Sequence, residues 1–292
     1  MLTRRTLLAS AGASLLAGRA LADAYPTQTI RIIAGFPPGG GIDISARLIA
    51  EPLKTLGQTV IVENRTGAAG MLAANTVAKA PADGHMLLMA TSGEIAIAQH
   101  LYKDKMTYDP LRELAPIALI GVVPCVVVVA TATPVHNPKE LIAYCKAHAG
   151  KLSFSSSGVG NPQQLAGELM NTMAGTSVLH VPYRGAAPAV TDVASGAVSM
   201  SFSSLAAALP LIKADKLRAV AVTSKDRMPQ LPDVAPLADG PCLAGYELLN
   251  WFGLLTTGGT PQPIVDRLNG IVETALKHPA IPDKLVPPGI VP

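Results

Sequence analysis

Two turns that lie far apart in this chain are built from Gly, Pro and Ser and carry almost no charge. The first, residues 32–43, contains the run Phe36-Pro37-Pro38-Gly39-Gly40-Gly41, and the second spans residues 152–162. Each turn follows an apolar run and opens a helical pattern. Because a helix N-terminus has unpaired N–H groups and a partial positive charge, it attracts anions. Two such termini that face each other could hold a small carboxylate without an arginine, and this is the chemistry that we predict.

Nucleotide-binding motifs fit these turns poorly. Gly35 and Gly40 have the spacing of part of a phosphate loop, but Gly41-Ile42 stands where Lys and Ser or Thr are required. The run Gly158-Val159-Gly160 starts a dinucleotide fingerprint, but Gln163 occupies the place of its third Gly. We therefore expect neither a triphosphatase nor a dinucleotide-binding enzyme.

Nucleophilic catalysis would need a serine beside a base. The chain contains no G-x-S-x-G motif, and three consecutive serines, residues 155–157, are the candidate nucleophiles. His180 is the nearest candidate base in the sequence, but we expect it at a strand end rather than beside these serines. We favour hydroxyls that donate hydrogen bonds, and we predict that the protein is not an enzyme.

The composition is typical of a globular protein that does not bind nucleic acid. Of the 292 residues, 49% are hydrophobic, which is enough for a full core, and only 4% are aromatic, which is few for base stacking. The formal net charge of +3 comes from Arg4, Arg5 and Arg19, because removing them from the 23 basic residues leaves as many as the 20 acidic ones. A near-neutral chain favours neither nucleic acid nor an anionic membrane as a partner.

Residues 1–22 have the pattern of an export signal. The run Thr3-Arg4-Arg5-Thr6 is positively charged, residues 7–17 are mildly apolar, and Ala20-Leu21-Ala22 is a small-residue cleavage motif. The apolar run is too short to span a bilayer. We predict cleavage before Asp23 and a mature protein outside the cytoplasm, with the twin-arginine route favoured over the general secretory route. The alternative is a disordered N-terminus without a signal.

Expected strands and helices alternate along the chain, which favours α/β sheets that are mostly parallel. A long apolar run at residues 117–130 is interrupted by Pro124, which is poorly placed in a central strand, so we interpret it as a segment that crosses between two domains. The strand and helix order of the start is repeated from residue 151. A late strand is expected at residues 254–257, after a stretch rich in proline.

This order predicts one α/β domain, an inserted second α/β domain, and a return to the first, with two crossovers. We assign residues 1–22 to the signal, residues 23–124 and 225–292 to the first domain, and residues 125–224 to the second. Two crossovers leave a cleft with a hinge. Ligands of open α/β sheets bind beyond the carboxyl ends of the strands, where we expect the turns at residues 36–43, 64–70 and 155–162.

Two positions near the expected cleft have both a structural and a functional interpretation. Asp43 lies in the first turn of a helix, where it caps the helix or, less favoured, contacts a ligand. The loop after His180 contains Tyr183 and Arg184 and either closes over the ligand or leaves Arg184 as a solvated surface charge. We expect Asp192 to be structural.

The chain gives no pattern for a metal site or a cofactor. Cys125, Cys145 and Cys242 show neither C-x-x-C nor zinc spacing, and the six histidines form no i, i+4 pair. Two of the cysteines could pair in an exported protein, or all could be free thiols. We predict no metal, no cofactor and a monomer.

Several motifs, in their order along residues 25–289, resemble the Bug/TctC family of extracytoplasmic solute receptors of tripartite tricarboxylate transporters. They are Tyr25-Pro26, Phe36-Pro37-Pro38-Gly39-Gly40-Gly41-Ile42-Asp43, residues 62–70, residues 79–84, His180-Val181-Pro182-Tyr183-Arg184-Gly185, residues 217–224 and Trp251-Phe252-Gly253-Leu254. Each motif alone is weak, but the set is specific. The resemblance implies a periplasmic-binding-protein-like fold, with two α/β domains in a Venus flytrap arrangement that close on a carboxylated solute.

The resemblance also implies which residues hold the solute through main-chain N–H groups and bridging water. Matching positions give a first grip of Phe36, Pro38, Gly39, Gly40 and Asp43. The facing grip would be Ser155, Ser156, Gly158, Gly160 and Asn161. The remaining wall would be Asn64, Ala68, Thr91 and Ser92 in the first domain and Tyr183, Arg184, Gly185 and Ala186 in the second.

We therefore expect a periplasmic receptor that captures a small organic acid and delivers it to the integral-membrane components of such a transporter. Two alternatives remain open. One is an exported enzyme that acts on a small carboxylated substrate, and the other is a ligand-sensing subunit of a membrane signalling system. The sequence does not name the acid.

Overall fold

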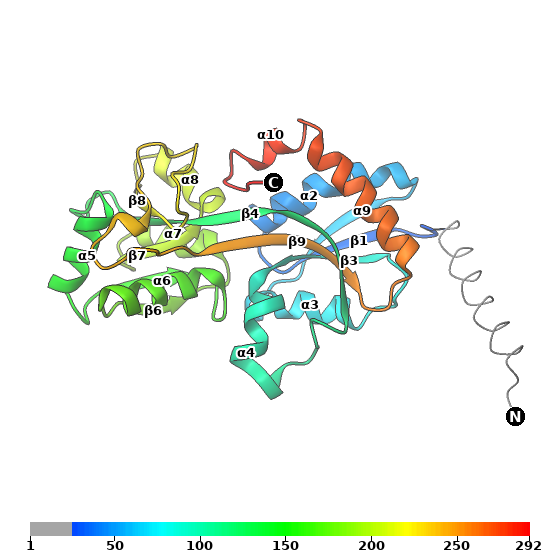
Figure 1. The fold of residues 1–292 in the computed structure, drawn as a ribbon, viewed down its shortest axis with the longest axis horizontal. Coiled ribbons are helices and arrows are strands. Elements are labelled where there is room, and N and C mark those ends of the chain that lie inside the picture. The colour runs from blue at the N-terminus through cyan, green and yellow to red at the C-terminus, as the bar shows by residue number, and fades with distance from the viewer. Residues whose placement is uncertain (1–24) are drawn as a thin grey trace, which may run out of the picture.

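The computed structural model describes residues 25–292, which fold into two lobes joined by two long strands (Figure 1). The strands of the first lobe are β1 (Ile30–Ala34), β2 (Val60–Asn64) and β3 (Met86–Thr91), and its main helices are α2 (Gly41–Leu53), α3 (Met71–Ala78), α4 (Ala98–Tyr102), α9 (Gln262–Lys277) and α10 (Pro282–Leu285). The strands of the second lobe are β5 (Ser153–Ser156), β6 (Leu179–Pro182), β7 (Met200–Ser204) and β8 (Leu217–Val222), and its helices are α5 (Pro138–Ala147), α6 (Pro162–Ala174), α7 (Ala186–Ala194) and α8 (Leu205–Lys213).

Parallel pairing builds the outer part of each lobe. β1 pairs with β2 and β3, and β5 pairs with β6 and β7. Parallel neighbours need a long connection, which α2 and α6 supply between β1 and β2 and between β5 and β6. The carboxyl ends of β1 and β5 therefore both lead into a turn and a helix N-terminus, as the sequence predicts.

Two antiparallel strands, β4 (Leu114–Ala130) and β9 (Leu249–Thr257), run from one lobe to the other (Figure 1). β4 pairs with β9 up to the Pro124–Leu249 pair, and from Cys125 onward it pairs with β7 and β8. Pro124 cannot donate to a sheet ladder, and it lies where β4 changes partners. The expected crossing segment is thus one continuous strand.

The second crossover begins earlier than the sequence predicts. β9 starts at Leu249, whereas the expected strand started at residue 254. Asn250 and Gly253 interrupt the apolar pattern, but pairing of Asn250 with Val123 and of Gly253 with Leu119 keeps this segment in the sheet. The sequence prediction therefore missed residues 249–253, the part of β9 that passes between the lobes.

The segment between β8 and β9 packs with the second lobe. Leu237, Leu243 and Tyr246 are buried in one core cluster with Phe154, and Tyr246 Oη donates to the carbonyl of Ala166 at 2.8 Å. The sequence prediction returned the chain to the first domain at residue 225. Because of this packing, we propose that the return is made at the start of β9.

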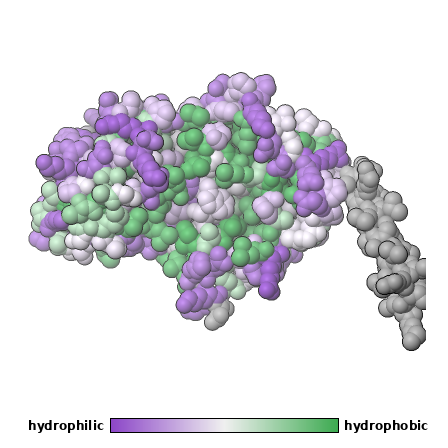
Figure 2. All heavy atoms as spheres, viewed as in Figure 1, coloured by the Kyte–Doolittle hydropathy of each residue, from purple (hydrophilic) through white to green (hydrophobic). Residues whose placement is uncertain are grey.

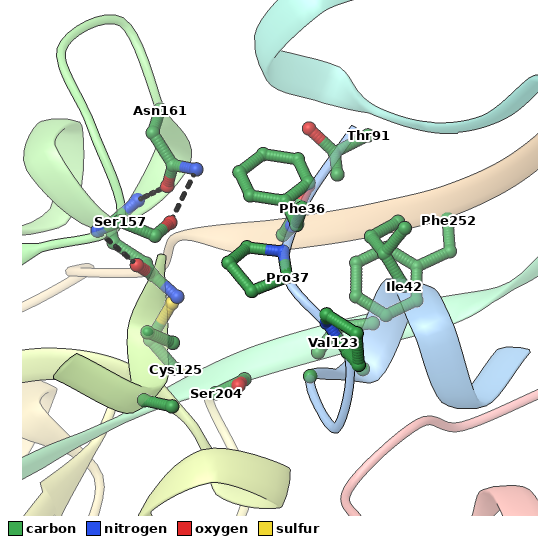
Figure 3. A pocket seen from close by; sticks show the side chains of 17 residues that line it. Phe36, Pro37, Ile42, Thr91, Val123, Cys125, Ser157, Asn161, Ser204 and Phe252 are labelled. Carbon is green, nitrogen blue, oxygen red and sulfur yellow. Dashed lines mark hydrogen bonds between the residues drawn. The ribbon is translucent and has the colours of Figure 1, made fainter. Parts of the chain in front are cut away.

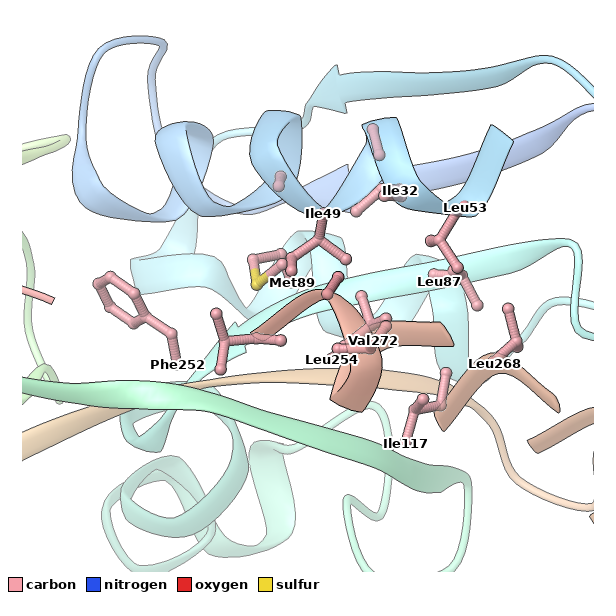
Figure 4. Packing of buried hydrophobic residues seen from close by; sticks show 14 of the residues in the cluster. Ile32, Ile49, Leu53, Leu87, Met89, Ile117, Phe252, Leu254, Leu268 and Val272 are labelled. Carbon is pink, nitrogen blue, oxygen red and sulfur yellow. The ribbon is translucent and has the colours of Figure 1, made fainter. Parts of the chain in front are cut away.

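Each sheet is covered by helices on both faces. In the first lobe, Ile49 and Leu53 of α2 and Leu268 and Val272 of α9 pack against strand residues such as Leu254 (Figure 4). A smaller cluster lies under α3 on the other face. In the second lobe, α5 and α6 contribute to one cluster and α7 and α8 to another. This layering fixes the helix N-termini relative to the cleft.

The structure bears on the expectations about membrane spans and cysteines, but not on the predicted export signal. Within residues 25–292, none of the helices combines the length and apolar character needed to cross a membrane. The predicted signal at residues 1–22 lies outside the described residues. Cys125, Cys145 and Cys242 are free thiols, of which the first two are buried and the third is exposed.

A pair of helix glycines tests how tightly α6 packs. A Cβ on Gly167 would lie 2.4 Å from Phe154 Cε2, and the Phe154 ring is fully buried, whereas a Cβ on Gly270 in α9 would have no neighbour within 4 Å. We expect Gly270→Ala to stabilise the protein by about 0.5–1 kcal/mol through helix propensity. Gly167→Ala should destabilise it by about 1–3 kcal/mol because the core is overfilled. Urea unfolding of both variants measures the difference, and equal shifts would contradict the packing described here.

Candidate functional site

A cavity lies between the lobes, beside the two crossing strands, and its void measures about 590 Å³ with the open mouth included. Figure 3 shows Phe36 and Pro37 between Asn161 and Ser157 of the second lobe and Ile42 and Phe252 of the first. The lining residues are Phe36, Pro37, Pro38, Gly40, Gly41, Ile42, Thr91, Val123, Cys125, Ser157, Asn161, Gln163, Ala186, Ala187, Ser204, Asn250 and Phe252.

A hydrogen-bonded cluster around Asp43 shapes the turn after β1. Asp43 Oδ2 accepts from the Gly39 N–H and from Arg47 Nε, both at 3.0 Å, and Oδ1 accepts from Asn64 Nδ2 at 2.9 Å. Asn64 Nδ2 also donates to the Phe36 carbonyl at 3.0 Å. Burial raises the pKa of Asp43, but the hydrogen bonds from Arg47, Gly39 and Asn64 outweigh it and hold the pKa below its usual value.

This cluster decides which amides of the turn remain free. The Gly39 N–H, which we expected to face a ligand, donates to Asp43 instead. The N–H groups of Gly41 and Ile42, in the first turn of α2, find no acceptor within residues 25–292. Because both residues line the cavity, their amides are available to a ligand there.

The second predicted grip differs from the expectation. The Ser157 N–H donates to Gln163 Oε1, the Gly158 N–H to Ser156 Oγ, and the Gly160 N–H to Gln164 Oε1. The main-chain donors of this turn are therefore largely engaged within the second lobe. In this structure polar side chains of β5 and α6 accept from the Gly158 and Gly160 amides, so the role of these amides in ligand binding stays a prediction.

The free amides of the second lobe lie instead at the start of α7. The N–H groups of Ala186 and Ala187 have no acceptor in the described part of the chain, and both residues line the cavity. Gly185 precedes them with extended ψ 166° and φ 148°, which directs the chain into the helix. Two helix N-termini, one from each lobe, thus face the same space.

Side chains complete the polar part of the wall. Asn161 caps α6 by accepting from the Gln163 N–H at 2.8 Å, and its Nδ2 donates to Ser157 Oγ at 2.7 Å. Asn250 Oδ1 accepts from the Ser92 hydroxyl at 2.8 Å, from the Trp251 N–H at 2.8 Å, and from the Ser92 N–H. These bonds tie the turns of both lobes to the cavity wall.

A buried carboxyl group lies directly behind Thr91. Glu94 is 1% exposed, and its two carboxyl oxygens accept from the Thr91 N–H and hydroxyl, both at 2.7 Å. Burial raises the pKa of Glu94 to about 7, although the bonds from Thr91 act in the opposite direction. Tyr108 Oη donates to the Glu94 carbonyl at 2.6 Å. Sequence analysis did not single out Glu94.

The cavity lining contains no Asp, Glu, Lys, Arg or His. Phe36, Ile42, Val123 and Phe252 make one side of it apolar. At the surface, Figure 2 shows apolar residues over the middle of the molecule and hydrophilic residues over its outer helices. Burial raises the pKa of the Cys125 thiol to about 12, so this group is neutral as well. Recognition of an anion here would depend on dipoles rather than on a charged side chain.

A second cavity adjoins the first and shares Phe36 and Ser157 with it. Its other lining residues are Gly35, Gly67, Ala68, Ala69, Gly70, Tyr102, Gly158, Val159, Pro182, Tyr183 and Arg184. Tyr183 Oη donates to Asp192 at 2.5 Å, which gives Asp192 the expected structural role. Arg184 is exposed and is the one charged residue among those that line the two cavities.

The lobes are in contact around these cavities. A Cβ on Gly185 would lie 2.9 Å from Pro37 Cδ, and a Cβ on Gly158 would lie 3.0 Å from Ala69 Cβ. Tyr102 Oη reaches the Val159 carbonyl at 3.5 Å. The lobes therefore touch at several points beside the two cavities.

The predicted site residues fall into three groups. Those that line the first cavity are Phe36, Pro38, Gly40, Thr91, Asn161 and Ala186, and those that line the second are Phe36, Ala68, Gly158, Tyr183 and Arg184. Those that line neither are Gly39, Asp43, Asn64, Ser92, Ser155, Ser156, Gly160 and Gly185. Members of this last group hold the turns, as Asp43 and Asn64 do for the turn after β1.

Sequence reasoning missed the residues that the crossing strands contribute. Val123 and Cys125 of β4 and Asn250 and Phe252 of β9 line the cavity where the strands pass between the lobes. Phe252 belongs to a motif that supports the family resemblance, and that motif was the available signal. The others resemble ordinary strand residues in the sequence.

The structure does bring a serine next to His180. Ser156 Oγ lies 2.6 Å from His180 Nε2 and also 3.0 Å from the Gly158 carbonyl. Ser156 is fully buried and lines neither cavity, and burial lowers the pKa of His180. The pair braces the turn after β5 and has no access to a solute between the lobes.

Comparison with known proteins agrees with this geometry. The sequence profile of TctC, the tripartite tricarboxylate transporter family receptor, matches residues 45–292. The chain belongs to the TctC family. The predicted family and the predicted periplasmic-binding-protein fold are therefore confirmed, and the protein is a solute-binding receptor of this family.

Individual relatives cover most of the chain. Protein BugT of Bordetella pertussis is 33% identical over 98% of this chain and 86% of its own length. The structure of R. palustris Rpa4515 with adipate has a TM-score of 0.88 at 35% identity and covers 92% of this chain and 89% of that one. MatC from Rhodopseudomonas palustris with bound malate has a TM-score of 0.84 at 32% identity. The match covers 91% of this chain and 90% of that one.

The buried acid behind Thr91 predicts a pH dependence of stability. The pKa of Glu94 rises from its ordinary 4.5 in the unfolded chain to about 7 in the folded one. The folded protein therefore binds more protons between these values, so Glu94 lowers the stability as the pH rises from 4.5 to 7, by about 3 kcal/mol in total. Glu94→Gln should lack this decline, and urea unfolding at pH 5, 6, 7 and 8 measures it.

The test compares slopes with pH rather than absolute stabilities, because the Gln amide can add an offset that does not vary with pH. Parallel stability curves for the wild type and Glu94→Gln would show that Glu94 does not titrate in this range.

Proposed function

We propose that this receptor binds a small carboxylate between its lobes, leaves it chemically unchanged, and presents it to the membrane components of a tripartite tricarboxylate transporter. The observation that carries the proposal is the pair of free helix N-termini, Gly41-Ile42 and Ala186-Ala187, that face one uncharged cavity from opposite lobes. Solved relatives hold adipate and malate, which supports a carboxylate as the ligand.

Closure follows from the same arrangement. Each lobe supplies one set of donors, so a carboxylate is fully hydrogen-bonded only when the lobes meet. The ligand would shift the population toward the closed form through these additional contacts. A transporter could then distinguish the loaded receptor by its shape.

The proposal includes location and assembly. We propose that residues 1–22 direct export to the periplasm, with the twin-arginine route favoured by the pair Arg4 and Arg5. We further propose that the protein acts as a monomer. Transport is favoured over signalling because the family is named for its transporter. Uptake assays in a deletion strain would separate these two roles.

Catalysis is disfavoured by the chemistry of the wall. The first cavity has no titratable side chain except the Cys125 thiol, whose high pKa makes it a poor nucleophile while buried. The Ser156–His180 pair is buried away from the cavity. We therefore propose binding without turnover, and product analysis after incubation with each bound acid tests it.

Ligand capture can be followed through the native cysteines. A thermal-shift screen over a carboxylic-acid panel should identify ligands, because a ligand at 100 times its Kd stabilises the folded state by about 2.7 kcal/mol. The identified acid should then slow alkylation of Cys125, which lines the first cavity. Exposed Cys242 is the internal control and should react at an unchanged rate.

Peptide mass spectrometry measures both rates in one sample. Buried Cys145 lies in the second-lobe core and reports unfolding. A stabilising acid that leaves the Cys125 rate unchanged would place its binding elsewhere on the molecule.

The role of the α7 amides can be tested by removing one donor. Ala186→Pro deletes the N–H at the first helical position, where Pro is tolerated, and the ψ of 166° at the preceding Gly185 lies outside the α region that a following Pro disfavours. We expect affinity for the carboxylate to fall about 10- to 100-fold, the loss for one hydrogen bond to a charged group. Ala186→Ser keeps the N–H and should bind like the wild type in calorimetry.

Melting temperatures of both variants show whether the fold is retained. Equal affinities of a folded Ala186→Pro and the wild type would show that the Ala186 N–H does not bind the ligand.

A further inference from the structure

Apart from Ser204, the polar side chains of the first cavity have acceptor atoms that are already engaged. Asn250 is 8% exposed, and its Oδ1 accepts three donors, the Ser92 N–H, the Ser92 hydroxyl and the Trp251 N–H. A reversed amide would direct its NH2 group at two backbone N–H groups, so the orientation is fixed. Asn250 Nδ2 has no acceptor within residues 25–292 and belongs to a residue of the cavity wall.

Gln163 repeats this pattern on the opposite lobe. It is 7% exposed, and its Oε1 accepts from the Ser157 N–H at 2.8 Å. Its Nε2 likewise has no acceptor in the described chain. Because a backbone N–H can only donate, the amide cannot be reversed without losing this bond. A second NH2 group is therefore left for the cavity.

The remaining polar groups add donors. Ser157 Oγ already accepts from Asn161 Nδ2 at 2.7 Å, which leaves its proton to be donated. Ser204 is at the N-cap of α8 but makes no capping hydrogen bond, and its hydroxyl has no partner among residues 25–292. The amides at the starts of α2 and α7 are donors by nature. Among these groups, only the Ser204 hydroxyl can act readily as an acceptor as well.

We infer that this cavity selects a carboxylate that carries no ammonium group, and that Asn250 and Gln163 determine this specificity. A ligand held here meets N–H and O–H groups from both lobes, which suit carboxylate, carbonyl, ether and hydroxyl oxygens. An ammonium group has only donors, and no charged side chain lines the cavity to neutralise it. The nearby carboxylates are engaged elsewhere, Asp43 with Arg47 and Glu94 with Thr91.

The inference rests on the proposed function. Pairs of ligands that differ only in an amino group test the specificity inference separately from carboxylate binding itself. The probes are acids and the corresponding α-amino acids, namely succinate with aspartate, glutarate with glutamate, and adipate with 2-aminoadipate, measured by calorimetry with the full chain. In each pair that binds, we expect the amine-free acid to bind at least about 100-fold more tightly, because an unpaired polar group is strongly rejected in a closed site. Malate should resemble succinate, since its hydroxyl oxygen can accept.

Two outcomes are distinct. An amino acid that binds as tightly as its amine-free partner overturns the specificity inference and leaves carboxylate binding intact. Failure of every acid in both series to bind overturns the proposed function together with the inference.

Substitution of the donor tests the residue directly. Asn250→Asp keeps an oxygen for Ser92 and Trp251 but replaces Nδ2 by a second oxygen. We expect binding of the amine-free acid to weaken about 10- to 100-fold, and the preference over the amino acid to shrink or reverse. Asn137→Asp adds the same charge at the N-cap of α5, outside the cavity, where it keeps the cap to the Glu140 N–H but loses the bond from Nδ2 to the Glu140 carboxylate. This control should retain the wild-type preference.

Gln163→Glu provides a second variant if Asn250→Asp does not fold. Its carboxylate can still accept from the Ser157 N–H, and it should change the preference in the same direction. An unchanged preference in a folded Asn250→Asp or Gln163→Glu would overturn the assignment of specificity to that residue.

Discussion

The binding site depends on backbone N–H groups that the fold leaves unpaired at two helix N-termini. Helices always begin with such donors, but most are satisfied by caps or water. In α2 and α7 the first-turn amides of Gly41, Ile42, Ala186 and Ala187 lie against a common space, and neither N-cap glycine offers a side chain to satisfy them. The absence of a capping side chain is thus what makes the site available to an anion.

Other hydrogen bonds in the region serve to hold these donors in place. The Asp43 carboxylate gathers Gly39, Arg47 and Asn64 and so fixes the entry into α2. Asn161 and its neighbours do the same for the turn before α6. A preorganised donor set avoids the cost of ordering a loop when the ligand binds. Residues that never touch the solute can therefore be as important to affinity as those that do.

The crossing strands join the site to the hinge. β4 and β9 pass between the lobes side by side, and Val123, Cys125, Asn250 and Phe252 lie on them at the cavity wall. Asn250 also bonds to Ser92 at the end of β3, so the wall, the hinge strand and the first lobe are linked by one amide. Movement of the lobes must change the environment of these residues, which is why Cys125 can report on closure.

The sequence by itself determined the alternation of strands and helices, the crossing segment around Pro124 and the Gly-rich turn after β1, because these depend on local periodicity and on the conformational limits of Gly and Pro. Only the tertiary structure decided which amides stay free. Gly39, Gly158 and Gly160 donate to side chains that are brought to them by folding, whereas the Ala186 N–H finds no acceptor in the part of the chain that the structure describes. Hydrogen bonding is a pairwise property of atoms in space, and no residue type or spacing specifies it.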